Sequence, residues 1–326
     1  MAQEHSLHTP FCGMVGIEFP VVLAGMGGVS WPELVAAVSN AGGLGIYGAA
    51  GLEPDEIRAG IRTIKSLTDK PWALDLLVPL PGVFDDQIDV MFEEKVPIFL
   101  SALGIPDWII PRAKAAGMLV GAMVGAPRHA QKARAAGIDF VVAQGTEAGG
   151  HTGNIGLMTL LPQVVAAAGD MPVLAAGGIA TGAGLAAAMA LGAQGAVVGT
   201  RFIASDEAHA ADSWKQRILE SGANDTTLTR CYTGKQIRTL RNQYTQSWVG
   251  REDQILAFPE QMEVSREADV LDLLGTSDDP DRGCLPTGQG CGLIDDLKPA
   301  AAIVAQMVEE AMTALVRLPG AIPDAD

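Results

Sequence analysis

PVLAAGGIATGAGLAAAMALGAQGAVVGTRF, from Pro172 to Phe202, is the stretch of sequence that decides the fold. A short apolar run leads into a Gly-rich turn, an Ala-rich segment follows, and a second apolar run ends in another turn that contains Gly. Apolar runs that alternate with helical segments are typical of parallel strands joined by helices. The stretch therefore predicts two buried parallel strands with a helix between them.

The same unit recurs from Pro20 to about Arg201. The candidate strands are Pro20–Gly25, Gly43 onward, Trp72–Leu77, Pro97–Ala102, Leu119–Val124, Asp139–Gln144, Pro172–Gly177 and Gly195–Thr200. Eight such strands predict an α/β fold of the (β/α)8 TIM barrel class. The alternative is a doubly wound open sheet with GMGGVSW as its Gly-rich turn, but no acidic residue suited to binding a ribose ends the next strand, GLGIYG.

Helix signals lie between these runs. In SWPELVAAVSNAGG, Ser30 can cap the first turn, Pro32 fits near the start, and Gly42 can end the helix. The segments RHAQKARAAGI and GAGLAAAMALGA repeat the pattern.

The βα regularity fails after Phe202. Charged residues, Thr and Arg are frequent from about residue 212 to 290, and apolar residues recur with helical spacing from Ala268 to Leu274. We therefore predict a barrel formed by residues 1–211 and 291–326, with an inserted, mainly helical cap at 212–290. The closing segment PAAAIVAQMVEEAMTALVRL is amphipathic and predicts a helix that completes the outer ring.

Composition narrows the classes of function. The 326 residues are 48% hydrophobic and 5% aromatic with 39 glycines, which favours a closely packed core of Ala, Val, Leu and Ile. The length fits one barrel with an extra segment and two domains equally well. The net charge of −16 disfavours binding to nucleic acid and to anionic membranes. The chain has no apolar run of membrane-spanning length, and MAQEHSLHTPFCG does not resemble a signal peptide, so we expect a cytoplasmic protein.

Cysteine and histidine spacing indicates no metal site. Cys12, Cys231, Cys284 and Cys291 form no CxxC pair, and the five histidines are scattered. We expect buried or incidental thiols.

Two Gly-rich loops follow the last two candidate strands. AGGIATG contains Gly177 and Gly178, and GTRF begins with Gly199 and Thr200. Barrels often hold phosphate at these two loops, where glycines expose backbone N–H groups and the helix beginning near Thr181 adds its positive end. A phosphate site is the preferred interpretation, and tight packing of helix on strand is the alternative.

AQGTEAGGHTG, from Ala143 to Gly153, follows the sixth strand at the same rim. His151 is the candidate acid or base, because imidazole exchanges protons near neutral pH; a structural role is the alternative. Glu147 is as well suited to accept hydrogen bonds that brace the loop. In the acidic chain, YTGKQIRTLRNQYTQSW is the most basic stretch; Lys235, Arg238 or Arg241 could bind a phosphorylated nucleotide or a CoA-type substrate, or form a solvated helix face.

These motifs, together with NAGGLG (Asn40–Gly45) and GQGCGLI (Gly288–Ile294), resemble the nitronate monooxygenase family, formerly called 2-nitropropane dioxygenases. The resemblance implies FMN without metal, His151 as the catalytic base, and oxidation of a small-molecule nitronate by O2. The positions that it implies for FMN binding are Ala24, Gly25, Met26, Asp75, Gln144, Gly149, Gly150, Ala176, Gly177, Gly178, Gly199 and Thr200. The chain departs from the family pattern at Leu23, Met123 and Gln144, where members have Gln, Lys and Asp.

EAGGHTG and NAGGLGIYG are also similar to FMN-dependent enoyl-acyl-carrier-protein reductases, in which NAD(P)H reduces the flavin. NADH:quinone reductases are related as well. The alternatives are therefore an NAD(P)H-dependent reductase of enoyl thioesters or quinones, and a barrel that binds a phosphorylated ligand without turnover. The oligomeric state stays open, with a homodimer as one alternative.

Overall fold

Eight parallel strands form the barrel in the computed structural model, which describes residues 7–77, 82, 84–271 and 279–317. The sheet order is β1-β9-β8-β6-β5-β4-β3-β2, and a parallel bridge between Val22 and Leu44 joins the two edges. The strands are β1 (Val21–Leu23), β2 (Gly45–Gly48), β3 (Trp72–Leu76), β4 (Ile98–Ser101), β5 (Leu119–Val124), β6 (Phe140–Gln144), β8 (Val173–Ala176) and β9 (Ala196–Val198). The predicted TIM barrel and its eight strands are confirmed, and the open-sheet alternative is wrong.

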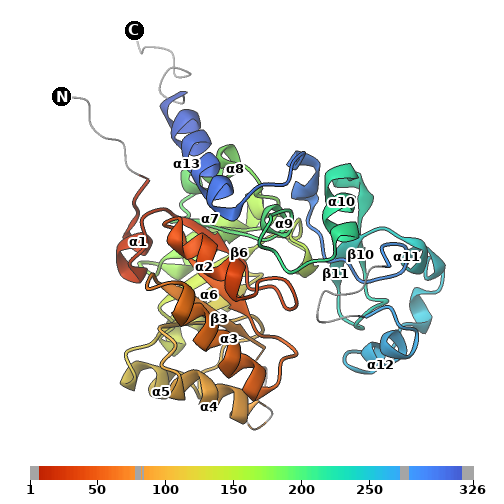
Figure 1. Cartoon of the computed structure of the whole chain (residues 1–326), viewed down its shortest axis with the longest axis horizontal. Helices are drawn as coiled ribbons and strands as arrows, with labels where there is room; N and C mark the ends of the chain where they lie inside the picture. The colour runs from red at the N-terminus through yellow and green to blue at the C-terminus, as the bar shows by residue number, and fades with distance from the viewer. Residues whose placement is uncertain (1–6, 78–81, 83, 272–278, 318–326) are drawn as a thin grey trace.

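Helices surround the strands (Figure 1). They are α2 (Pro32–Asn40), α3 (Pro54–Leu67), α4 (Asp85–Glu93), α5 (Ile110–Ala115), α6 (Pro127–Ala136), α7 (Leu157–Ala168), α8 (Gly182–Ala190), α9 (Thr200–Ile203) and α13 (Ala300–Arg317). Pro32 begins α2, and Gly42, with φ of 89°, follows its end, as predicted. The predicted cap Ser30 is wrong: Trp31 occupies the cap position, and the Ser30 hydroxyl binds other backbone groups.

The barrel interior is filled by apolar side chains from the strands and from α1 (Pro10–Val15). Phe11 of α1 is fully buried and packs edge-on against Phe140 of β6, with ring centroids 5.3 Å apart. At Gly121 of β5, an added Cβ would overlap that Phe140 ring. The small residues on the strands therefore make room for a few large side chains inside the barrel.

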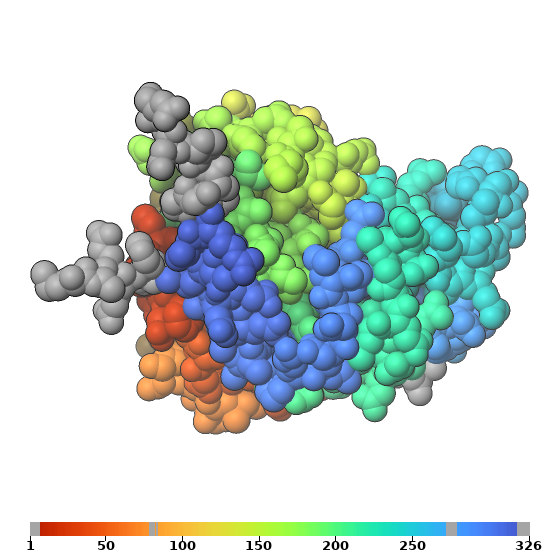
Figure 2. Space-filling model, turned by 90° about the horizontal axis from the view of Figure 1, so that it is seen from above, coloured from red at the N-terminus to blue at the C-terminus, as the bar shows by residue number. Residues whose placement is uncertain are grey.

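The cap segment forms a lobe on one side of the barrel (Figures 1 and 2). It contains α10 (Asp212–Glu220), η1 (Ala223–Asp225), β10 (Thr226–Thr229), β11 (Ile237–Leu240), α11 (Gln243–Ser247), η2 (Glu252–Gln254), α12 (Glu260–Glu267) and η3 (Gln289–Leu293), the last of which runs back into the barrel. The sequence did not predict β10 and β11. The predicted helix at Ala268–Leu274 is wrong as far as residue 271, because α12 ends at Glu267 and Asp269 has φ of 54°; residues 272–274 lie outside the described residues.

Helix α13 packs directly on α8, as the predicted completion of the ring requires. At Gly182, an added Cβ would overlap the Met307 carbonyl oxygen and lie 2.5 Å from the backbone N of Ala311. The Gly182 N–H also donates to the Glu310 carboxylate at 2.8 Å. The two helix backbones therefore approach each other only because residue 182 has no side chain.

We predict that Gly182→Ala destabilises the barrel by roughly 1–3 kcal/mol, because the new methyl group meets backbone atoms that have no freedom to move away. Thermal melting followed by circular dichroism measures the effect. Gly184→Ala is the control, since its Cβ would make only an ordinary 3.4 Å contact with Ile179. Equal melting temperatures for the two variants would contradict this account of the contact.

Candidate active site

The carboxyl ends of the barrel strands bring the predicted loops to one rim. After β1, Gly25 lies against Asp75 of β3, and an added Cβ at Gly25 would overlap the Asp75 carboxyl group. Asp75 is buried, and its Oδ1 has no hydrogen-bond partner among the residues that the structure describes. Burial without a nearby cation raises the pKa of Asp75 well above its ordinary value. Asp75 is thus a buried carboxyl group whose protonated form is favoured by burial, and its Oδ1 has no hydrogen-bond partner among the described residues.

Ser30 fixes the turn that carries Met26. Its hydroxyl oxygen accepts from the backbone N–H groups of Met26 (2.8 Å) and Gly48 (3.1 Å). At Gly48, an added Cβ would overlap the Met26 backbone. The sequence did not predict that Ser30 holds this turn or that Gly48 lets the two backbones approach. The closing glycine of GLGIYG was the available signal for a close backbone approach.

The two Gly-rich loops lie side by side because β8 and β9 are neighbours. Gly177 and Gly178 have φ of 108° and 71°, and their backbone N–H groups have no acceptor in the described part of the chain. Thr181 caps α8 and accepts from the Gly184 N–H. An added Cβ at Gly199 would meet only side chains at 3.5 Å and beyond. Free N–H groups and a helix N-terminus make this place suited to an anion such as phosphate.

The last motif, GQGCGLI, returns to these loops. The Thr200 hydroxyl accepts from the Gly288 N–H at 3.0 Å, and Gln289 N–H donates to the Glu147 carbonyl at 2.9 Å. An added Cβ at Gly149 would meet Gly288 N at 2.8 Å. Gly149 therefore allows close packing against the backbone of Gly288. The Thr200 hydroxyl already accepts one hydrogen bond from within the protein.

Glu147 braces the His151 loop. Both of its carboxylate oxygens lie 3.0 Å from the backbone N–H of Leu157, which begins α7. A carboxylate at a helix N-terminus is stabilised by the helix dipole. The loop-bracing interpretation of Glu147 is thus confirmed.

His151 lies in a short strand, β7 (Gly150–His151), that pairs with β11 of the cap. Ile237 is its partner in the antiparallel register, and the ring Nε2 lies 3.0 Å from the Thr233 hydroxyl. Although one side of the residue is exposed, the surrounding protein and then the nearby Lys235 charge lower the pKa of His151 to about 4. At neutral pH the imidazole is uncharged and able to accept a proton.

The three basic candidates of the cap have different environments. Arg238 is buried and donates to the Thr146 carbonyl (2.8 Å) and the Thr226 hydroxyl (3.0 Å), so it braces the loop after β6. Arg241 is exposed and donates to the Asn224 carbonyl at 3.1 Å. The Lys235 ammonium is half-buried and has no acceptor in the described chain, and burial lowers its pKa. Lys235 is therefore the cation beside His151 that is available to a substrate.

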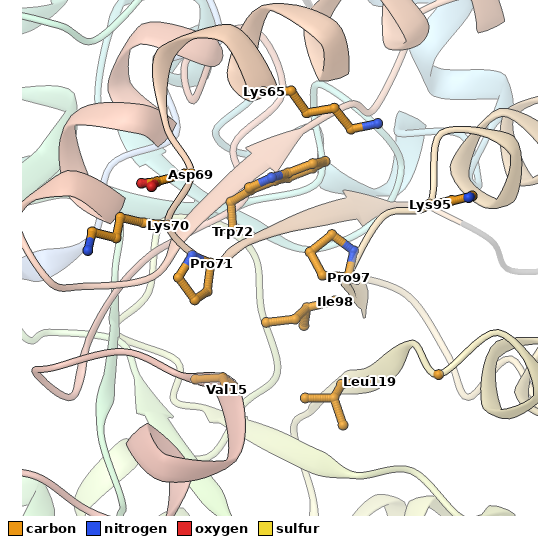
Figure 3. A pocket seen from close by; sticks show the side chains of 11 residues that line it. Val15, Lys65, Asp69, Lys70, Pro71, Trp72, Lys95, Pro97, Ile98 and Leu119 are labelled. Carbon is orange, nitrogen blue, oxygen red and sulfur yellow. The ribbon is translucent and has the colours of Figure 1, made fainter.

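An open pocket of about 480 Å³ lies at the opposite end of the barrel (Figure 3). It is lined by the first residues of three strands, Trp72, Ile98 and Leu119. Of its lysines, Lys65 is paired with Glu94, and the ammonium groups of Lys70 and Lys95 lie on opposite sides in Figure 3. The pocket thus gathers no converging polar groups and lies far from the rim that carries His151.

Comparisons with known proteins agree with this geometry. The chain matches the family model "Nitronate monooxygenase" over residues 8–91 and 81–310. It is 41% identical over 242 residues to the (3aS,4S,5R,7aS)-5-hydroxy-7a-methyl-1-oxo-octahydro-1H-indene-4-carboxyl-CoA dehydrogenase of Rhodococcus jostii (strain RHA1), covering 74% of this chain and 68% of the relative. It is 34% identical over 305 residues to a probable nitronate monooxygenase of Staphylococcus saprophyticus, covering 79% and 86%.

Among solved structures, FabK from Thermotoga maritima superposes with a TM-score of 0.87 at 35% identity, covering 96% of this chain and 99% of that chain. The fold, the family and the relatives together define an α/β-barrel oxidoreductase. The chain belongs to the nitronate monooxygenase family.

Two further findings concern the described residues only. None of their helices is both long and apolar enough to cross a membrane. No three of their His, Cys, Asp and Glu side chains lie together in a way that could hold a metal ion.

We predict that the His151 ring titrates with a pKa near 4 in the folded protein and that Lys235→Met moves this pKa upward, because a nearby positive charge disfavours the imidazolium. The pKa should stay below its ordinary value, since burial remains. Nuclear magnetic resonance titration of the histidine rings measures both values. Lys95→Met, at the other end of the barrel, is the control. An unshifted pKa of His151 in Lys235→Met would contradict the electrostatic effect of Lys235 on the ring.

Proposed function

We propose that the protein is an FMN-dependent nitronate monooxygenase, which oxidises alkyl nitronates and their parent nitroalkanes with O2. The observation that carries the proposal is the uncharged His151 imidazole beside the Lys235 cation, at the rim that also carries the backbone N–H groups of Gly177 and Gly178. Neither the Lys235 ammonium nor these N–H groups have an acceptor among the described residues. This arrangement suits a carbon acid whose conjugate base is an anion. It combines a base for the proton with a cation for the developing charge.

The residues at the rim fit FMN. The N–H groups of Gly177, Gly178 and Thr200 are suited to the phosphate, and the space at Gly199 admits it. The orphaned Oδ1 of Asp75 is suited to a flavin ring, whose edge carries both N–H and C=O groups. Burial raises the pKa of Asp75 and so favours its protonated form, which can donate to such a carbonyl. Ala24, Met26, Gln144, Gly150 and Ala176 lie at the carboxyl ends of β1, β6 and β8 or in the loops that follow them, and we assign them to the same site.

In the proposed mechanism, bound FMN supplies the redox chemistry between the organic substrate and O2. The chain supplies the acid–base and charge functions. His151 accepts the proton from the carbon next to the nitro group, and Lys235 attracts the nitro group or the nitronate. The Ser30 and Glu147 hydrogen bonds hold the surrounding loops in place during turnover.

A second candidate is a dehydrogenase or reductase of a carboxyl-CoA thioester. Its second substrate would be a nicotinamide cofactor, NAD(P)H, or a quinone. The 41% identity to a carboxyl-CoA dehydrogenase favours it. The carbon next to a thioester carbonyl is also a carbon acid, so His151 would serve the same purpose. Anaerobic reduction distinguishes the candidates: bleaching of the flavin by nitronate supports the monooxygenase, and rapid bleaching by NAD(P)H or by an acyl-CoA supports the second candidate.

We predict that the protein purifies yellow with FMN and that Gly178→Asp weakens FMN binding about tenfold or more, because its carboxylate repels the phosphate. Gly178→Asn is the matched control. Asn and Asp both tolerate the φ of 71° at this position and have nearly the same shape. Fluorescence titration of the apoprotein gives the dissociation constants, and equal values for the two variants would remove this loop from the phosphate site.

We predict that His151→Asn lowers kcat/KM for a neutral nitroalkane by about 10²- to 10⁴-fold, the usual contribution of a positioned general base. The preformed nitronate needs no deprotonation, so its turnover should fall far less. Stopped-flow reduction under anaerobic conditions measures both. Equal losses with the two substrates, at full flavin occupancy, would show that His151 does not accept the proton.

A further inference from the structure

Thr233, in the turn between β10 and β11, has one hydroxyl group and three polar neighbours. Its oxygen lies 3.0 Å from His151 Nε2, 3.1 Å from the Lys235 carbonyl oxygen and 3.3 Å from the Lys235 backbone N. The residue is only 5% exposed, so water does not take over any of these interactions. The direction of each hydrogen bond follows from counting the protons.

The carbonyl of Lys235 can only accept a hydrogen bond, and its backbone N–H can only donate one. The single hydroxyl proton of Thr233 therefore goes to the carbonyl. The remaining lone pair can accept only from a ring nitrogen that carries a proton. If the hydroxyl proton pointed at the ring instead, two oxygens would face each other at 3.1 Å with no hydrogen between them.

We propose that Thr233 is a positioning residue that holds neutral His151 in the tautomer with the proton on Nε2, which leaves Nδ1 as the atom that accepts the substrate proton. Nδ1 has no hydrogen-bond partner in the described parts of the chain. Pairing of β7 with β11 fixes the backbone of His151. The ring of Phe258 packs edge-on against the imidazole, with ring centroids 6.5 Å apart.

The proton-transfer step rests on the proposed function. The C–H bond next to the nitro group breaks, its proton forms an N–H bond at Nδ1, and the electron pair stays on the substrate as the nitronate. Before and after the step, Nε2–H donates to Thr233. The ring therefore needs no flip between its neutral and charged states.

Nitrogen-15 NMR of the full-length protein with labelled histidine tests the tautomer, and His151→Asn identifies the signals. We expect a protonated Nε2 and an unprotonated Nδ1 at neutral pH. A protonated Nδ1 in the unaltered protein would overturn the proposal, whether or not any variant folds. Thr233→Val should shift the ring toward the Nδ1–H tautomer and Thr233→Ser should not. Thr229→Val is the control, because its hydroxyl accepts from the Cys231 N–H in the same hairpin and, among the described residues, has no hydrogen bond to His151 or Lys235.

Kinetics of the same variants test the consequence. We expect Thr233→Val to lower kcat for a neutral nitroalkane about tenfold, the effect of losing one hydrogen bond, with nitronate turnover unchanged and Thr233→Ser near the original rate. Equal losses with both substrates would overturn the positioning role. If the tautomer shifts but nitroalkane turnover does not, Nδ1 is not the acceptor, and the positioning role of Thr233 in proton transfer is overturned while the hydrogen-bond assignment stands.

Discussion

Closure of the barrel between β1 and β2 is the constraint on which the rest of the structure depends. The bridge between Val22 and Leu44 requires the two strands to approach closely, and an added Cβ at Gly43 would lie 2.6 Å from the Val21 carbonyl oxygen. Once the ring is closed, the carboxyl ends of all eight strands face the same side. The Gly-rich loops, Asp75 and the His151 loop then meet at one rim, although they are far apart in the sequence.

The cap completes the rim. Its strand β11 pairs with β7, the Thr233 hydroxyl contacts the His151 ring, and Lys235 places a positive charge close to that ring. Gln236 adds hydrogen bonds to the Gly153 carbonyl and to Asn154, so the loop after β6 is bound along most of its length. The rim of the proposed active site is thus shared between barrel and cap, and the environment of His151 depends on both.

Much of the barrel could be predicted because its signals are local. Each strand is an apolar run bounded by turn residues, and even the boundaries of Leu119–Val124 agree with the structure. Ser30 was mistaken for a helix cap because the partners of its hydroxyl, Met26 and Gly48, depend on the approach of two strands. Thr233 could not be found from the sequence, since it lies 82 residues from His151 and meets it only through the pairing of β7 with β11. The cap strands were missed for a different reason, because neither is buried on a pattern that alternates along the sequence.

The two-residue strand β7 also has a consequence for engineering. Exchange of the cap between relatives is one way to vary the residues around the rim. In this fold such an exchange would also replace Thr233, the hydrogen-bond partner of the His151 ring. Chimeras that keep residues 226–240 and Phe258 with the barrel would preserve the contacts of the His151 ring.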